Sequence, residues 1–142
     1  MLFRSIKKDK PCDGVTKPAL LLGAHVAALG MRFYSGDMFP AQYKDAMFIA
    51  RHGSWNRNKL NGFDVVMVKA GADGKVTMTP FLAGLMDGYK NTFAGRPTDV
   101  LQMPDGALLV SDEQNGAIYR VSYGAKAAPA KEAPKKGSKT KT

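Results

Sequence analysis

Residues 95–121 decide the fold; they read GRPTDVLQMPDGALLVSDEQNGAIYRV and alternate short apolar runs with turn-forming residues. Three apolar runs have the length of strands: 100–103, 107–111 and 117–122. Pro104-Asp105-Gly106 separates the first two runs and Gln114-Asn115-Gly116 separates the last two, and both tripeptides favour tight turns. The stretch therefore predicts consecutive antiparallel strands.

The preceding part of the chain has the same character. Residues 46–50 form a short apolar run, and residues 62–68 form a β-branched run that begins at the strong turn signal Asn61-Gly62. A further turn over 72–75 precedes a short strand over 76–78. The chain as a whole is thus predicted to be all-β.

Only residues 80–90 carry apolar side chains at roughly helical spacing. Gly84 and Gly88 interrupt this segment, so we expect a loop with at most one turn of helix.

The two halves also repeat each other. Residues 45–68 and residues 105–121 each contain an apolar strand, a polar loop and a second strand, with a period of about 60 residues. This period suits one blade of a β-propeller with an insertion. Since each blade buries its faces only against its neighbours, the pattern predicts about two blades of antiparallel sheet over residues 18–124.

The net charge of +9 is concentrated at the ends of the chain. Residues 125–142 carry +5 and residues 1–17 carry +3, which leaves the middle nearly neutral. A nucleic-acid-binding domain usually carries its charge on a folded face, so no nucleic-acid partner is expected. The Lys/Ala/Pro tail of residues 125–142 is predicted to be disordered, and an anion-binding arm is the alternative. Residues 1–17 are predicted to be disordered or non-native, with no signal peptide and no apolar run long enough to span a membrane.

Arg96 is the first candidate site residue, because it stands in a Gly-Arg-Pro turn just before a strand. Its guanidinium could bind a carboxylate with two parallel hydrogen bonds, or it could cap carbonyl groups at a blade edge. Asp99, Asp105 and Asp112 lie at turns and strand ends, and Asp99 is expected to accept hydrogen bonds from backbone amides.

A second candidate group lies in one loop. His52 and Trp55 flank a Gly-Ser turn, and Arg57 and Lys59 follow. The loop could offer cations and a stacking surface to a planar ligand, or it could be a connection whose Trp55 packs on the next blade. His25 is expected to be a structural hydrogen-bonding residue rather than a base.

Other site classes lack their motifs. The sequence has no calcium loop of the EF-hand type, no Cys/His zinc spacing, no phosphate loop and no nucleophile elbow. Two histidines and one cysteine leave little room for a nucleophilic triad, so a self-contained hydrolase is not expected.

Residues 18–123 resemble the glucose/sorbosone dehydrogenase family, whose members use pyrroloquinoline quinone. The stretches that carry this resemblance are His25–Gly30, Phe33–Gly36, Phe39-Pro40, His52–Arg57 and Gly95–Val121. The resemblance implies a six-bladed β-propeller that oxidises an aldose sugar or sorbosone, with calcium assisting the quinone and with export to the periplasm or outside the cell. The quinone would supply the redox chemistry, and the protein would position it.

The resemblance also implies roles for individual residues. Arg96 matches the first of two arginines near the quinone, whereas the second falls at Thr98. Arg57 or Lys59 is the nearest candidate for a family lysine. The family's catalytic histidine and most of its calcium ligands lie on earlier blades, so neither His25 nor His52 is assigned that role and no catalytic or metal-binding residue is predicted.

We therefore expect a C-terminal fragment of a quinone-dependent sugar dehydrogenase that supplies part of the cofactor rim and is inactive alone. Two isolated blades would leave sheet faces uncovered, so poor solubility or partial folding is also expected. The alternative is a non-catalytic, propeller-repeat module that binds a partner or assembles with other copies.

Overall fold

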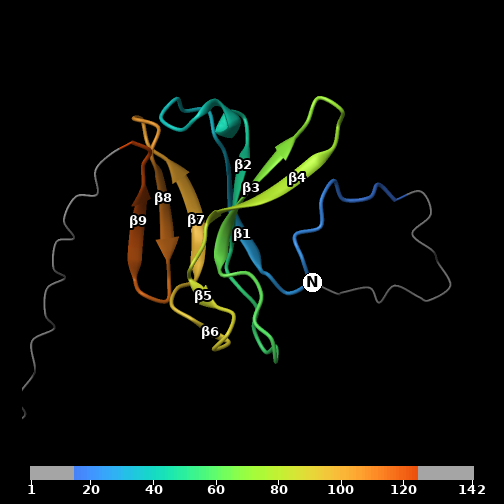
Figure 1. The fold of residues 1–142 in the computed structure, drawn as a ribbon, viewed down its shortest axis with the longest axis vertical. Helices are drawn as coiled ribbons and strands as arrows, with labels where there is room; N and C mark the ends of the chain where they lie inside the picture. Colours follow the sequence, from blue (N-terminus) through green and yellow to red (C-terminus); the bar gives the residue numbers. More distant parts are fainter. Residues whose placement is uncertain (1–14, 125–142) are drawn as a thin grey trace, which may run out of the picture.

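The computed structural model describes residues 15–124, and this part of the chain is built from antiparallel strands (Figure 1). The strands are β1 (Ala28–Phe33), β2 (Met47–Arg51), β3 (Asp64–Ala70), β4 (Val76–Leu82), β5 (Met86–Asp87), β6 (Thr92–Phe93), β7 (Pro97–Gln102), β8 (Leu108–Asp112) and β9 (Ala117–Val121). A single turn of 3-10 helix, η1 (Ala41–Tyr43), is the only helical element among the described residues. The predicted all-β class is confirmed.

Strands β1 to β4 form one four-stranded sheet and β7 to β9 form a three-stranded sheet, each in sequential order. We call them the first and the second sheet; β5 and β6 form a separate small hairpin. The two sheets pack face to face, as neighbouring blades of a β-propeller do, and β7 of the second sheet lies against β1 and β2 of the first (Figure 1).

Alternation along the strands explains this packing. Phe48, Ala50 and Val65 of the first sheet share one buried core with Leu108 and Val110 of the second. Because side chains alternate between the two faces of a strand, the residues between them point away from this core.

An aromatic group closes the core at the end near η1. Tyr34, Phe39, Phe81 and Phe48 form a closed series of four edge-to-face pairs, with ring centroids 4.5–5.9 Å apart. Such pairs stabilise a core beyond their buried area.

The predicted repeat is present in the packing of the two sheets. Phe48 and Ala50 of β2 take the same places as Leu108 and Val110 of β8, 60 positions later, and all four are buried in the common core. A shift of one residue would exchange the two faces of a strand, so the burial of all four side chains excludes an offset that differs from this one by a single residue. The same offset of 60 positions aligns His52 with Asp112.

The predicted runs 46–50, 62–68, 100–103, 107–111 and 117–122 match β2, β3, β7, β8 and β9 to within a few residues. The prediction for residues 76–90 was wrong in part. β4 continues through Pro80 to Leu82, and β5 lies where a loop was expected. Pro80 is tolerated because β4 is an edge strand, which need not donate its backbone N–H to a further neighbour.

The predicted disordered tail, residues 125–142, lies outside the described residues, as do residues 1–14 of the N-terminal segment. Residues 15–17 are exposed and belong to no strand. Within the described part, no helix is long and apolar enough to cross a bilayer.

Candidate functional site

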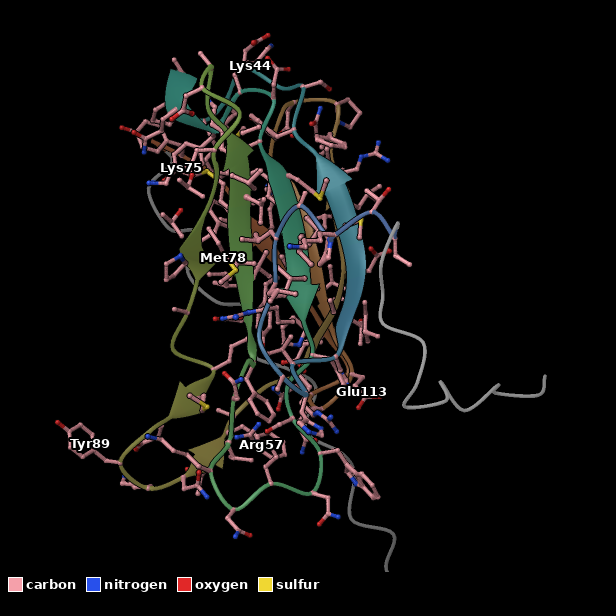
Figure 2. The ribbon with its side chains drawn as sticks, turned by 90° about the vertical axis from the view of Figure 1, so that its right-hand side faces the viewer. Lys44, Arg57, Lys75, Met78, Tyr89 and Glu113 are labelled. Carbon is pink, nitrogen blue, oxygen red and sulfur yellow. The ribbon has the colours of Figure 1, made fainter. Side chains whose placement is uncertain are left out.

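One end of the two-sheet unit gathers the polar side chains of interest. β2 ends at Arg51 and β8 ends at Asp112, so His52 and Glu113 each directly follow the second strand of their sheet. Figure 2 shows Glu113 and Arg57 toward this end, opposite the end where Lys44 and Lys75 lie.

Asp112 organises the backbone of the site. Its side chain is buried, and it accepts hydrogen bonds from Arg96 N (2.9 Å), Gln114 N (3.0 Å), Asn115 Nδ2 (2.7 Å) and the Tyr119 hydroxyl (2.7 Å). Burial acts to raise the pKa of the Asp112 carboxyl, but the hydrogen bonds from Arg96, Asn115 and Tyr119 outweigh it and hold this pKa below its usual value. The same carboxylate, by accepting a hydrogen bond from the Tyr119 hydroxyl, raises the pKa of Tyr119.

Within the described part of the chain, the Arg96 guanidinium has a hydrogen-bond donor without a partner. Its guanidinium carbon lies 5.9 Å from the centre of the Phe63 ring and 5.7 Å from that of Phe93, and these two rings stack on each other at 4.7 Å. The side chain is 19% exposed, and its Nε is buried with no hydrogen-bond partner among residues 15–124. A buried donor without a partner is costly, so this guanidinium is suited to an anion.

His52 lies beside Arg96. Its Nδ1 is 3.2 Å from the carbonyl oxygen of Pro97, and since a carbonyl can only accept, Nδ1 carries the proton in this contact. Its Nε2 is 3.3 Å from Oε1 of Glu113, and the same oxygen is 3.7 Å from Nη1 of Arg96. His52 and Arg96, which are candidates from separate motifs, are thus joined through Glu113.

The remaining predicted residues lie on the loop that follows His52. Arg57 and Lys59 are exposed, and Arg57 Nε donates to the Lys59 carbonyl. Trp55 is 80% exposed, so it does not pack on the neighbouring sheet as the alternative interpretation required. In the described part of the chain, no hydrogen bond or ion pair joins any of these three side chains to Arg96 or His52.

The same loop is held to the turn between β5 and β6. The Asn91 side chain accepts a hydrogen bond from Leu60 N at 2.9 Å and donates one to the Asn58 carbonyl at 2.8 Å. The small hairpin therefore fixes the course of the loop that carries Trp55.

The backbone beneath the loop is tightly packed. Gly53 has a φ of +105°, and a Cβ there would lie 2.4 Å from the Phe63 ring. Phe63 itself has a φ of +64°, which is unusual for a bulky residue. The ring that supports Arg96 therefore belongs to a residue with a strained backbone conformation, as residues of functional sites often do.

The three candidate aspartates differ in what they bind. Asp99 accepts a hydrogen bond from a backbone amide, as expected, but this amide belongs to the next residue, Val100. Asp105 lies just before β8, where it accepts a hydrogen bond from Ala107 N and pairs with Arg120 of β9. Asp112 lies at the other end of β8. Asp112 is therefore the aspartate that binds the Arg96 amide, just before β7, as well as Tyr119 of β9.

Two other expectations concern His25 and Thr98. His25 is exposed, with a φ of +61°, and the expected hydrogen bond of its side chain is not found in the described part. Thr98, at the position of the missing second arginine, has its hydroxyl 2.6 Å from that of Ser111.

Sequence reasoning missed Glu113, Phe63 and Phe93. Glu113 follows a predicted strand, and nothing local indicates that its side chain turns toward His52. Phe63 stands in a predicted strand and Phe93 lies between predicted elements, so their stacking also has no local signal.

The arrangement can bind an anionic, planar group. The Arg96 guanidinium, the His52 ring, a stacked aromatic pair and an exposed tryptophan lie at one end of the unit, and the Glu113 carboxylate lies between Arg96 and His52. No group of three or more His, Cys, Asp or Glu side chains in residues 15–124 is placed to hold a metal ion.

The TrAA12-like family model matches residues 3–124. An uncharacterized protein of Borreliella burgdorferi is 39% identical over 104 residues, covering 72% of this chain and 27% of that protein. The pyrroloquinoline quinone-dependent pyranose dehydrogenase of Coprinopsis cinerea is 31% identical over 130 residues, covering 78% and 17%.

A solved structure has a similar arrangement of strands. The holo form of the pyranose dehydrogenase PQQ domain from Coprinopsis cinerea is 27% identical and superposes with a TM-score of 0.57, covering 75% of this chain and 29% of that one. The chain thus spans less than a third of the length of these relatives. Since the family model covers most of its length, the chain belongs to the TrAA12-like family.

Proposed function

We propose that this chain forms part of the cofactor rim of a quinone-dependent sugar oxidoreductase. The observation that carries the proposal is the guanidinium of Arg96, which lies against two stacked aromatic rings and has a buried Nε without a partner among the described residues. The dehydrogenase relative is named for its dependence on pyrroloquinoline quinone, a planar tricarboxylate, and this chemistry suits such a donor.

Each residue of the rim has a physical task in this proposal. Arg96 would bind a carboxylate through its free donors. His52 would present Nε2 to the same ligand, because Nδ1 is already occupied by the Pro97 carbonyl. Trp55 would stack on the planar ring system, and Arg57 and Lys59 would contribute positive charge from the loop.

The quinone would supply the oxidising chemistry, and the residues of this chain would bind and orient it. His52 is not a free base in this arrangement, because Nδ1 is held by Pro97 O and Nε2 faces Glu113. We therefore expect the chain alone, loaded with quinone and calcium, to show no sugar oxidation. Calcium in the complete enzyme and export from the cytoplasm remain predictions from the family resemblance.

The name of one relative supports a proposal for the substrate class. The named relative acts on a pyranose. This name favours an aldose sugar over sorbosone as the substrate of the complete enzyme.

A binding titration tests the proposal directly. The chain has one tryptophan, Trp55, and it lies in the loop beside the site, so its fluorescence can report on an added quinone. We expect saturable quenching by pyrroloquinoline quinone. Arg96→Ala should weaken binding at least about tenfold, and Arg96→Lys should weaken it less, because lysine keeps the charge but loses the paired donors.

Arg120→Ala is the matched control, since it removes an arginine that pairs with Asp105 away from the site. Its affinity for the quinone should equal that of the unchanged protein. Equal affinities for the Arg96→Ala and Arg120→Ala variants would refute the assignment of Arg96.

Exposed sheet faces favour a second candidate, a module that assembles with other copies. Met31 and Phe33 are exposed on the outer face of the first sheet, where Phe33 lines a groove of about 420 Å³. Leu101 and Ile118 are exposed on the outer face of the second sheet. Contiguous apolar faces of this kind commonly mark protein–protein interfaces.

A further inference from the structure

We infer that Glu113 is an internal carboxylate that occupies the anion position between Arg96 and His52, and that a bound ligand must displace it. This inference rests on the proposed function, because it concerns the same donors. It adds a specific role for a residue that opposes binding.

The first argument is geometric. One oxygen of Glu113, Oε1, lies 3.3 Å from Nε2 of His52 and 3.7 Å from Nη1 of Arg96. An optimal charged hydrogen bond between such groups is about 2.7–2.9 Å long. The carboxylate oxygen therefore lies between the two nitrogens without an optimal hydrogen bond to either of them, which makes it replaceable.

The second argument is the difference in how firmly the three groups are held. The side chains of Arg96 and His52 are only 19% and 13% exposed, and each has a further support, the aromatic pair for Arg96 and the Pro97 carbonyl for His52. The Glu113 side chain is 56% exposed, and within the described part of the chain it contacts no other cation. Arg96 and His52 are therefore held by packing and by a hydrogen bond, whereas the more exposed carboxylate of Glu113 can rotate into solvent.

The third argument concerns the backbone. Glu113 N donates to the Arg96 carbonyl at 3.2 Å, and the neighbouring Asp112 accepts from Arg96 N. The main chain of Glu113 therefore stays beside Arg96 when its side chain leaves. The carboxylate can return once the ligand dissociates, so the exchange needs no movement of either sheet.

The Glu113 carboxylate should affect both the ligand affinity and the charge balance of the site without a ligand. It lowers the affinity for an anionic ligand, because its contacts with the two donors must be broken first. While no ligand is present, it compensates the charge of the Arg96 guanidinium, which would otherwise be largely buried without a counter-ion.

The test compares Glu113→Gln with the unchanged 142-residue chain in the Trp55 fluorescence titration. Glutamine keeps the shape of the side chain but removes its charge. The probes are pyrroloquinoline quinone and benzene-1,3,5-tricarboxylate, which is planar and anionic but cannot accept a hydride. We expect Glu113→Gln to bind both probes about threefold to fivefold more tightly, the range that one or two partly exposed ion pairs are worth.

Asp37→Asn is the charge-matched control. Asp37 pairs with Lys44, which Figure 2 shows at the opposite end of the molecule, and its substitution changes the net charge by the same amount. Its affinities should equal those of the unchanged chain. Tightening by both variants would mean that net charge alone is responsible and would overturn the inference.

The remaining outcomes separate this inference from the proposed function. If the unchanged chain binds the quinone and Glu113→Gln binds it equally or more weakly, the role of Glu113 is refuted while the assignment of Arg96 stands. If neither chain binds either probe, the proposed function fails and this inference fails with it.

Discussion

Nε2 of His52 lies 3.3 Å from Oε1 of Glu113, although the two residues belong to different sheets and directly follow their second strands, β2 and β8. Because these strands hold equivalent places in the repeat, both of them end on the same side of the unit. Arg96, the third member, precedes the first strand of the second sheet, so the candidate site exists only where the two sheets pack together.

Asp112→Asn should destabilise the fold by about 2–4 kcal/mol at neutral pH, because a buried acceptor of several hydrogen bonds is replaced by a group that also donates. Chemical denaturation of both proteins at pH 7 measures this difference. The pKa of Asp112 is lower in the folded state than the usual 3.8. Its ionised form therefore stabilises the fold above that value, and the stabilisation is lost as the pH falls through the folded-state pKa.

The difference between the two proteins should accordingly shrink as the pH is lowered below about 4. A difference that stays constant down to about pH 2 would mean that the charge of Asp112 contributes nothing.

Tyr34→Phe should lower the free energy of unfolding by about 2–3 kcal/mol. The buried Tyr34 hydroxyl donates to the Gly106 carbonyl at 2.8 Å and accepts from the amides of Met38 and Phe39, so its loss leaves three backbone groups without this partner. Tyr43→Phe is the control, since no hydrogen bond of the Tyr43 hydroxyl is found in residues 15–124 and its ring packs in the same aromatic group. Thermal melts of the two variants should differ clearly, and coincident melts would contradict the role of this hydroxyl.

Gly30→Ala should loosen the contact between the sheets. A Cβ at Gly30 would lie 2.5 Å from the Asp99 Cα, so the backbone of β1 or β7 would have to move. Overpacking of this kind typically costs about 1–3 kcal/mol. Gly88→Ala serves as the comparison, because a Cβ there meets nothing within 4 Å.

Urea midpoints of the two glycine variants provide the measurement. The Gly88→Ala midpoint should stay close to that of the unchanged protein. If Gly30→Ala matched it, the close approach of β1 and β7 would be wrong.

Phe33→Glu should reduce self-association. Phe33 is exposed on the outer face of the first sheet and lines the apolar groove, and a carboxylate there would oppose burial against another copy. Sedimentation velocity across a concentration series measures the effect. Tyr89→Glu introduces the same charge at a fully exposed turn residue between β5 and β6, and it should leave the association unchanged.

A unit that stays monomeric at all concentrations before any substitution would exclude the self-assembling module. The proposal for the cofactor rim would be unaffected by that result.

The strand content of this protein follows from its sequence, because alternation and turn formation are local properties. Pro104-Asp105-Gly106 and Gln114-Asn115-Gly116 set the turns of the second sheet, and the Gly-Arg-Pro motif marks Arg96 as a candidate anion-binding residue. The repeat of about 60 residues is visible in the same way, and it correctly pairs Phe48 with Leu108 in the core.

Which side chains meet depends instead on how the two sheets pack. The bridge of Glu113 between His52 and Arg96 and the stacked pair of Phe63 and Phe93 join segments that are far apart along the chain. No local pattern encodes these contacts. Asp99, Asp105 and Asp112 have similar positions at turns and strand ends, but of the three only Asp112 accepts a hydrogen bond from the Arg96 amide. Such contacts form because two sheets bury a common face, and that packing is a property of the whole unit rather than of any single segment.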